Sequence, residues 1–99
     1  QTNDILETVL HRYDMYEESI TETVKHMNIP NCSMYIQMVH NHYLEEKLGR
    51  SFDYCDKNKA KIFFNELRKN KAVTPKALVK YLLVQTPFLN NVINKLRSR

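Results

Sequence analysis

The sequence contains one glycine and no tryptophan in 99 residues. Phosphate-binding loops of nucleotide enzymes need several closely spaced glycines, so Gly49 alone excludes both the Walker and the dinucleotide types. No Gly-x-Ser-x-Gly or His-Glu-x-x-His pattern of hydrolases and zinc peptidases is present either. These absences predict a protein that is not an enzyme and that carries no cofactor.

Cysteine is scarce, with only Cys32 and Cys55. If residues 33–48 are helical they span about 24 Å, too far for the ~4.4–6.8 Å Cα separation of a disulfide. Both side chains are therefore expected to be thiols in a reducing compartment inside the cell. His40 and His42 are two residues apart, about 200° around a helix. With no paired Cys-x-x-Cys or His-x-x-x-His spacing, we expect no metal site.

Long hydrophobic runs are also missing: no apolar stretch approaches ~20 residues, so no membrane span is expected. The chain begins with Gln1 rather than Met, which suggests a fragment or a processed product. An apolar fraction of 42% is enough for a real core. We therefore expect a single helical domain over residues 1–99, which we take as a monomer.

Charge is distributed unevenly. Residues 1–50 hold four Lys/Arg against eight Asp/Glu, a net charge of −4, whereas residues 51–99 hold eleven against three, a net charge of +8. A basic half beside an acidic half suggests an oriented contact with an anionic partner, although a small lysine-rich domain can also simply be solvated. The candidate contact residues are Lys57, Lys61, Arg68, Lys69, Lys71, Lys95 and Arg97, with Arg99 at the tail.

Helical periodicity runs through the whole chain, and no segment alternates with a period of two. Residues 4–28 carry an apolar stripe at spacings of three and four. A single helix there would be about 37 Å long, so the second capping box at Ser19–Glu22 favours a break near residues 15–19. The near-heptad stripe leaves a coiled-coil dimer as an alternative. The stripe consists of Leu6, Val9, Tyr13, Tyr16, Ile20, Val24 and Met27.

Four further helices and a connector follow the first segment, and three of these helices are described first. Ser33 is expected to cap a helix that runs to Leu48 and ends at Gly49 as a left-handed cap. Residues 50–55 then form a connector, and Phe52 folds back onto the core. Asp56 caps a helix to Asn70 that buries Ala60, Phe63, Phe64 and Leu67. The last helix spans residues 87–97.

Residues 75–86 form the segment around which we expect the fold to be organised. Thr74 is a good N-cap and Pro75 suits the first helical position, while Pro87 ends the segment. Its apolar side chains cover nearly every direction of a helix, and such a helix is usually buried on all sides. The sequence therefore predicts an all-α fold: a compact bundle of five or six short helices around a central apolar helix at 75–86.

The same segment argues against a conventional DNA-reading helix–turn–helix. Residues 56–70, a short turn and residues 75–86 have the right layout, but a recognition helix must expose polar side chains to the major groove. The second helix here is the most apolar of the chain. Scattered basic residues suit phosphates better than base edges.

Two stretches resemble known families. Residues 33–67, through Leu44, Glu45, Glu46, Leu48, Gly49, Phe52, Lys59, Ile62 and Phe63, resemble the C-terminal helical domain of the chromatin protein DEK, with a two-residue insertion in the connector. That resemblance implies a small module that binds DNA or chromatin. Residues 73–97, through Val73, Thr74, Leu78, Thr86, Leu96 and Arg97, are similar to the N-terminal docking domain of transcription elongation factor S. This second resemblance, which lacks that family's glycine, implies docking of peptides from other transcription proteins.

Two functions remain open from the sequence. The first is a helical module, nuclear in location, that contacts nucleic acid or chromatin through its basic C-terminal half. The alternative is a protein–protein docking domain that takes a partner helix or an acidic or amphipathic peptide. A secreted helical effector is disfavoured by the cysteine argument.

Overall fold

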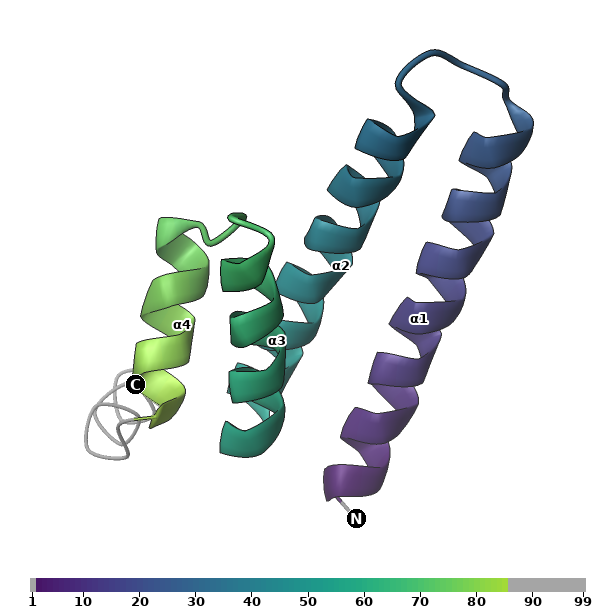
Figure 1. The fold of residues 1–99 in the computed structure, drawn as a ribbon. Helices are drawn as coiled ribbons and strands as arrows, with labels where there is room; N and C mark the ends of the chain where they lie inside the picture. The colour runs from purple at the N-terminus through teal and green to yellow at the C-terminus, as the bar shows by residue number, and fades with distance from the viewer. Residues whose placement is uncertain (1, 86–99) are drawn as a thin grey trace.

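A computed structural model describes residues 2–85 of the chain (Figure 1). It contains four α-helices and no strand within these residues: α1 (Thr2–His26), α2 (Cys32–Asp53), α3 (Lys57–Lys69) and α4 (Pro75–Gln85). The all-α expectation is confirmed. The expected helix at 87–97 lies outside the described residues. No helix in the described part of the chain has the length and hydropathy to cross a membrane.

Helix α1 is continuous, so the expected break near residues 15–19 is wrong. The Thr23 hydroxyl donates a hydrogen bond to the carbonyl oxygen of Ser19 at 2.9 Å, and this bond joins two successive turns of the helix directly after the expected break. Helices α1 and α2 form a long antiparallel hairpin that projects beyond α3 and α4 (Figure 1). The molecule measures 49 × 29 × 24 Å, which accommodates a helix too long for a sphere of this chain length.

Helix α2 runs through Gly49 to Asp53, so the expected glycine cap and the connector at 50–55 are not found. Gly49 is buried inside the helix, and a Cβ placed on it would lie 3.0 Å from Nζ of Lys80. The left-handed residue after the helix is Cys55, with φ of 56°. Phe52 is buried as expected, but from within the helix.

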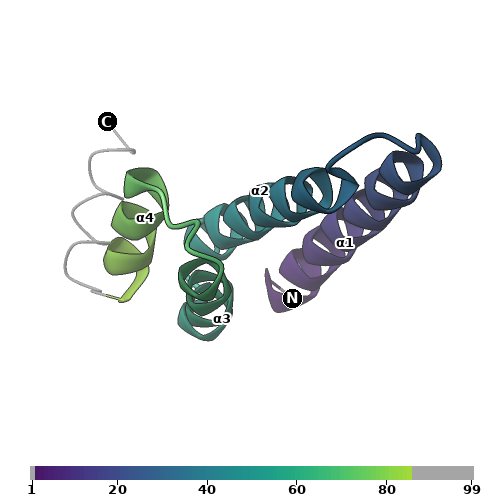
Figure 2. The ribbon, with the colours of Figure 1, turned by 45° about the horizontal axis from the view of Figure 1, so that its top comes forward.

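The helix that contacts all the others is α2, not α4. It packs against α1, α3 and α4 (Figures 1 and 2). Its Leu48 is fully buried. The core cluster consists of Leu44, Leu48, Phe52, Ala60, Phe64, Leu67, Ala77 and Val84.

The expectation of a central helix at 75–86 is therefore wrong for the described structure. On α4 only Ala77 and Val84 are buried, while Leu78, Val79 and Leu82 are 42%, 54% and 50% exposed. An apolar coat shows that a helix can be buried on every side, but burial also needs neighbours on every side. The described helices that contact α4 are α2 and α3, and its two buried residues, Ala77 and Val84, lie within about 20° of one another around it.

The expected N-caps of α3 and α4 are confirmed. The Asp56 carboxylate accepts a hydrogen bond from the backbone N–H of Lys59 at 3.0 Å. The Thr74 hydroxyl accepts one from the N–H of Ala77 at 3.1 Å and donates one to Glu45 at 3.2 Å. The second bond ties the start of α4 to α2. No disulfide links the two cysteines.

Candidate nucleic-acid interface

Helix α3 presents one side to the core and leaves a wide arc to solvent. Ala60, Phe64 and Leu67 are buried and lie within about 60° of one another around the helix. Phe63, also expected in the core, is half-buried next to them, with Nζ of Lys47 5.6 Å from its ring centroid. The remaining arc of α3 carries no core side chain.

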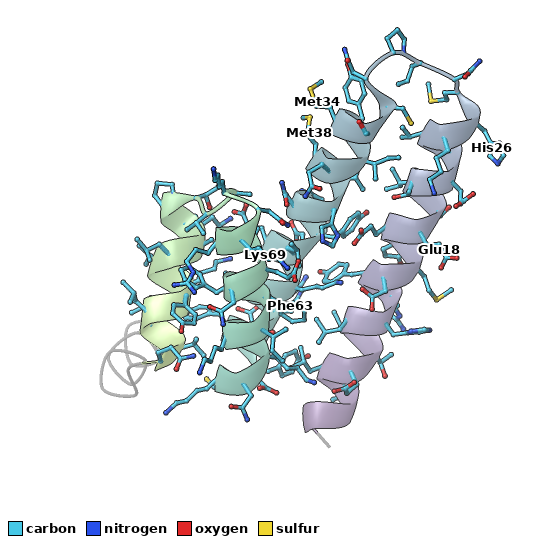
Figure 3. The ribbon with its side chains drawn as sticks, viewed as in Figure 1. Glu18, His26, Met34, Met38, Phe63 and Lys69 are labelled. Carbon is cyan, nitrogen blue, oxygen red and sulfur yellow. The ribbon has the colours of Figure 1, made fainter. Side chains whose placement is uncertain are left out.

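We call this exposed arc the basic face. Four of its seven side chains are cationic, three are neutral and none is a carboxylate. Lys57, Lys61 and Arg68 lie within about 40° of one another around the helix. Lys69, labelled in Figure 3, lies about 80° further round from Lys61. Along the axis the four cations span roughly 18 Å. The basic face consists of Lys57, Asn58, Lys61, Ile62, Asn65, Arg68 and Lys69.

Several cations elsewhere in the domain are paired. Lys47 forms an ion pair with Asp14, and Lys59 forms one with Glu7. The hydrogen bond to Glu7 raises the pKa of Lys59 above its ordinary value. These two contacts join α1 to α2 and α3. Two carboxylates of the acidic N-terminal half, Glu7 and Asp14, thus form ion pairs with lysines of the same chain.

Arg50 is held in a similar way. Its Nε donates a hydrogen bond to the Tyr13 hydroxyl at 2.9 Å, and its Nη1 lies 3.5 Å from Asp53. The hydrogen bond to Tyr13 is the main cause of the raised pKa of Arg50.

The cations of the basic face differ from these. Among the side chains that the structure describes, no carboxylate forms an ion pair with any of the four. The one carboxylate in the body of α3, Glu66, lies off the basic face and is 3.9 Å from Nε2 of His40. The basic face is therefore an uncompensated positive surface.

Helix electrostatics explain only part of this charge. Arg68 and Lys69 lie in the last turn of α3, where the helix dipole favours cations. Lys57 lies in the first turn, where the dipole disfavours a cation, and the only acidic residue at this end is the N-cap Asp56, whose carboxylate accepts the hydrogen bond from the Lys59 N–H. Lys57 and Lys61 thus contribute positive charge that the helix itself does not require.

The other candidate residues fall in two places. Lys71 is exposed in the turn after α3 and extends the basic face beyond the helix. Lys95 and Arg97 lie outside the described residues, as does Arg99. Lys76 and Lys80, which were not candidates, border a hollow of about 230 Å³ with Arg50 and three carboxylates. That hollow is balanced in charge, so it does not extend the basic face.

His40 marks a contact that the sequence did not reveal. Its Nδ1 lies 2.7 Å from a carboxylate oxygen of Glu17 on α1, and its Nε2 approaches Glu66 on α3. Only the packing of three helices brings these groups together. No group of three or more His, Cys, Asp or Glu side chains in the described part of the chain could hold a metal ion.

No family model, curated protein or solved structure matches this chain.

Proposed function

We propose that this domain binds nucleic acid through the basic face of α3, extended by Lys71. The observation that carries the proposal is the contrast between paired and unpaired cations. Lys47 and Lys59 are each paired with a carboxylate of α1, while the basic face keeps four exposed cations with no carboxylate among them. A dense array of lysine and arginine on one helix is the electrostatic footprint expected for a polyanion.

The chemistry of the basic face favours contacts to phosphates. It contains no aromatic side chain on which a base of a single strand could stack. Its roughly 18 Å length matches about five base pairs of duplex at 3.4 Å per base pair. Lysine and arginine at such spacing neutralise backbone charge without reading sequence. The proposed ligand is duplex nucleic acid bound with little sequence preference, which accords with a nuclear location.

The first prediction concerns salt. If three or four phosphates are neutralised, the logarithm of the association constant for duplex DNA falls with the logarithm of salt concentration with a slope of roughly −3 to −4. Fluorescence anisotropy with a labelled random-sequence duplex, measured across a salt series, gives that slope. Absence of binding even at low salt would exclude the proposal, because non-specific basic domains associate there.

Variants that each remove one positive charge test whether the basic face causes this salt dependence. Lys61→Gln and Arg68→Gln should each make the slope shallower by about one unit. Both residues border the buried Phe64, so glutamine is chosen to keep an alkyl stem there. Lys25→Gln on α1 removes the same charge far from α3 and should leave the slope unchanged. Equal effects of all three variants would show that only net charge matters.

Protein docking is the second candidate function, and the described surface contains one feature in its favour. Met34 and Met38 project from α2 on the side away from α1 and are 50% and 58% exposed (Figure 3). Exposed methionines on one helix face suit adaptable binding of an apolar partner segment. A docking domain would ignore duplex DNA at physiological salt and bind an amphipathic peptide. Its affinity would then depend on Met34 and Met38 rather than on Lys61.

A further inference from the structure

The basic face of α3 is made of two rows of side chains that differ in chemistry. Three of its cations lie within about 40° of one another around the helix and form what we call the cation row: Lys57, Lys61 and Arg68. Three uncharged side chains lie within about 60° of one another and form what we call the outer row: Asn58, Ile62 and Asn65. All six are exposed, and Ile62 is 60% exposed.

The outer row points most directly away from the core. Its centre lies about 160° around α3 from the centre of the buried residues Ala60, Phe64 and Leu67. Helix α3 packs against α2 and α4 (Figure 2). The ring centroids of Phe64 and Tyr81 lie 4.0 Å apart, which marks the side of α3 that faces α4. The cation row lies nearer to that side, so a ligand that approaches α3 head-on meets the outer row first.

The other flank of the outer row carries charges that already have partners. Lys59 pairs with Glu7 of α1, and a carboxylate oxygen of Glu66 lies 3.9 Å from Nε2 of His40 on α2. Neither row contains a carboxylate. Phosphates on the two sides of the outer row would therefore meet unpaired cations on one side and partnered carboxylates on the other.

The two amides of the outer row have no partner among the described residues. Elsewhere in the domain, side-chain amides are engaged: Gln37 and Asn70 both donate a hydrogen bond to Asn41 at 3.1 Å. The side chains of Asn58 and Asn65 form no such bond with any described group. Their donors and acceptors are open to a ligand.

These side chains match the major-groove edge of A·T base pairs. An asparagine amide can donate to N7 of adenine and accept from its N6 amino group, and an apolar side chain can pack against the C5-methyl group of thymine. Asn58 and Asn65 lie roughly 10.5 Å apart along the helix axis, the rise of about three base pairs at 3.4 Å each. Ile62 lies between them.

We propose that α3 enters the major groove of B-form DNA, where the outer row contacts A·T base pairs and the cation row holds the phosphates of one strand. This contact rests on the proposed function and narrows its ligand from duplex nucleic acid to DNA. The major groove of B-form DNA, about 12 Å wide, admits an α-helix, whereas that of A-form RNA is too narrow for side chains to read. RNA also lacks the thymine methyl group, because uracil carries hydrogen at C5.

The preference expected from three contacts is small. Two asparagine contacts and one methyl contact should favour an A·T duplex over a G·C duplex by at least about fivefold. Sequence-specific proteins typically discriminate by about 10³-fold or more. The cations therefore set the affinity for DNA, and the outer row adds a bias toward A·T pairs.

Fluorescence anisotropy at one salt concentration tests this bias with two duplexes of equal length, one of alternating A·T pairs and one of alternating G·C pairs. The unmodified protein should bind the A·T duplex at least about fivefold more tightly. A variant with Asn58→Ala and Asn65→Ala should lower this ratio below about twofold and keep the salt slope. Lys61→Gln is the matched control, which should weaken binding of both duplexes equally and keep the ratio.

Base analogues test whether the contacts lie in the major groove. Deoxyuridine in place of thymine removes only the C5-methyl group and should weaken binding of the unmodified protein at least about twofold, but not that of Ile62→Ala. In place of adenine, 7-deazaadenine removes N7 and should weaken the unmodified protein more than the double asparagine variant. Neither analogue alters the minor groove, so an A·T preference that survives both would overturn the proposal.

The two possible failures give different results. Absence of binding to any duplex at low salt would exclude the proposed function itself. The expected salt slope with equal affinity for the A·T and G·C duplexes, or for an A·T duplex and the corresponding A·U RNA duplex, would keep the proposed function and overturn the major-groove contact. Circular dichroism melts confirm that each variant is folded.

Discussion

In the described part of the chain, four residues other than glycine adopt a left-handed backbone conformation: Asn28, Asn31, Cys55 and Lys71, with φ between 56° and 60°. Asparagine tolerates this region, and both asparagines lie at the turn between α1 and α2. Lys71 and Cys55 occupy the position after a helix end where glycine is usually found. The one glycine of the chain lies instead within α2, where Lys80 comes close to its backbone.

A residue-scale prediction follows at Lys71. Lys71→Gly should raise the free energy of unfolding by about 1 kcal/mol, because glycine removes the Cβ clash of the left-handed conformation. Lys71→Ala, which keeps the Cβ, should give no such gain. Denaturant melts of the three proteins measure the difference. If Lys71→Gly destabilised the protein, the left-handed conformation at this turn would be wrong.

At the scale of elements, the helices differ in how much of each is surrounded. Helix α2 lies between the other three and buries residues from Leu44 to Phe52, whereas α4 buries only Ala77 and Val84. Stability should therefore be concentrated in the C-terminal half of α2.

Two leucine truncations test this difference. Leu48→Ala should lower the free energy of unfolding by about 2–5 kcal/mol, the usual range for a fully buried leucine. Leu82→Ala, at a half-exposed site on α4, should cost less than about 1 kcal/mol. Denaturant melts compare the two directly. A larger loss at Leu82 than at Leu48 would restore α4 as the centre of the fold.

At the scale of the whole molecule, the core occupies one end of the α1–α2 hairpin. The buried side chains of α1 are Leu6 and Leu10, and those of α2 begin at Leu44. Between them the hairpin extends past α3 and α4 toward a turn at residues 27–31 (Figure 1). Its far half is joined mainly by half-buried contacts such as that between Cys32 and Val24.

Hydrogen exchange should reveal that the far half of the hairpin is less stable than the half that contains the core. Backbone amides of residues 20–38 should exchange at least about tenfold faster than those of residues 44–53 and 60–67, because local opening of the far half exposes little apolar surface. Mass spectrometry of peptides from a native-state exchange series measures the ratio. Uniform protection along both helices would contradict this difference in stability.

The sequence by itself determined some of the local features of this protein. The caps at Asp56 and Thr74 and the buried positions of α3 were readable because they depend on residues three or four apart. The exposed lysines of α3 were readable for the same reason.

Only the tertiary structure decided which helix is central, that α1 is unbroken, and that α2 continues through Gly49. It also decided which cations remain uncompensated. Lys59 and Lys61 look alike in sequence, but 52 residues separate Lys59 from the Glu7 that pairs with it. Contacts of this kind depend on how helices pack, and no local pattern of residues encodes them.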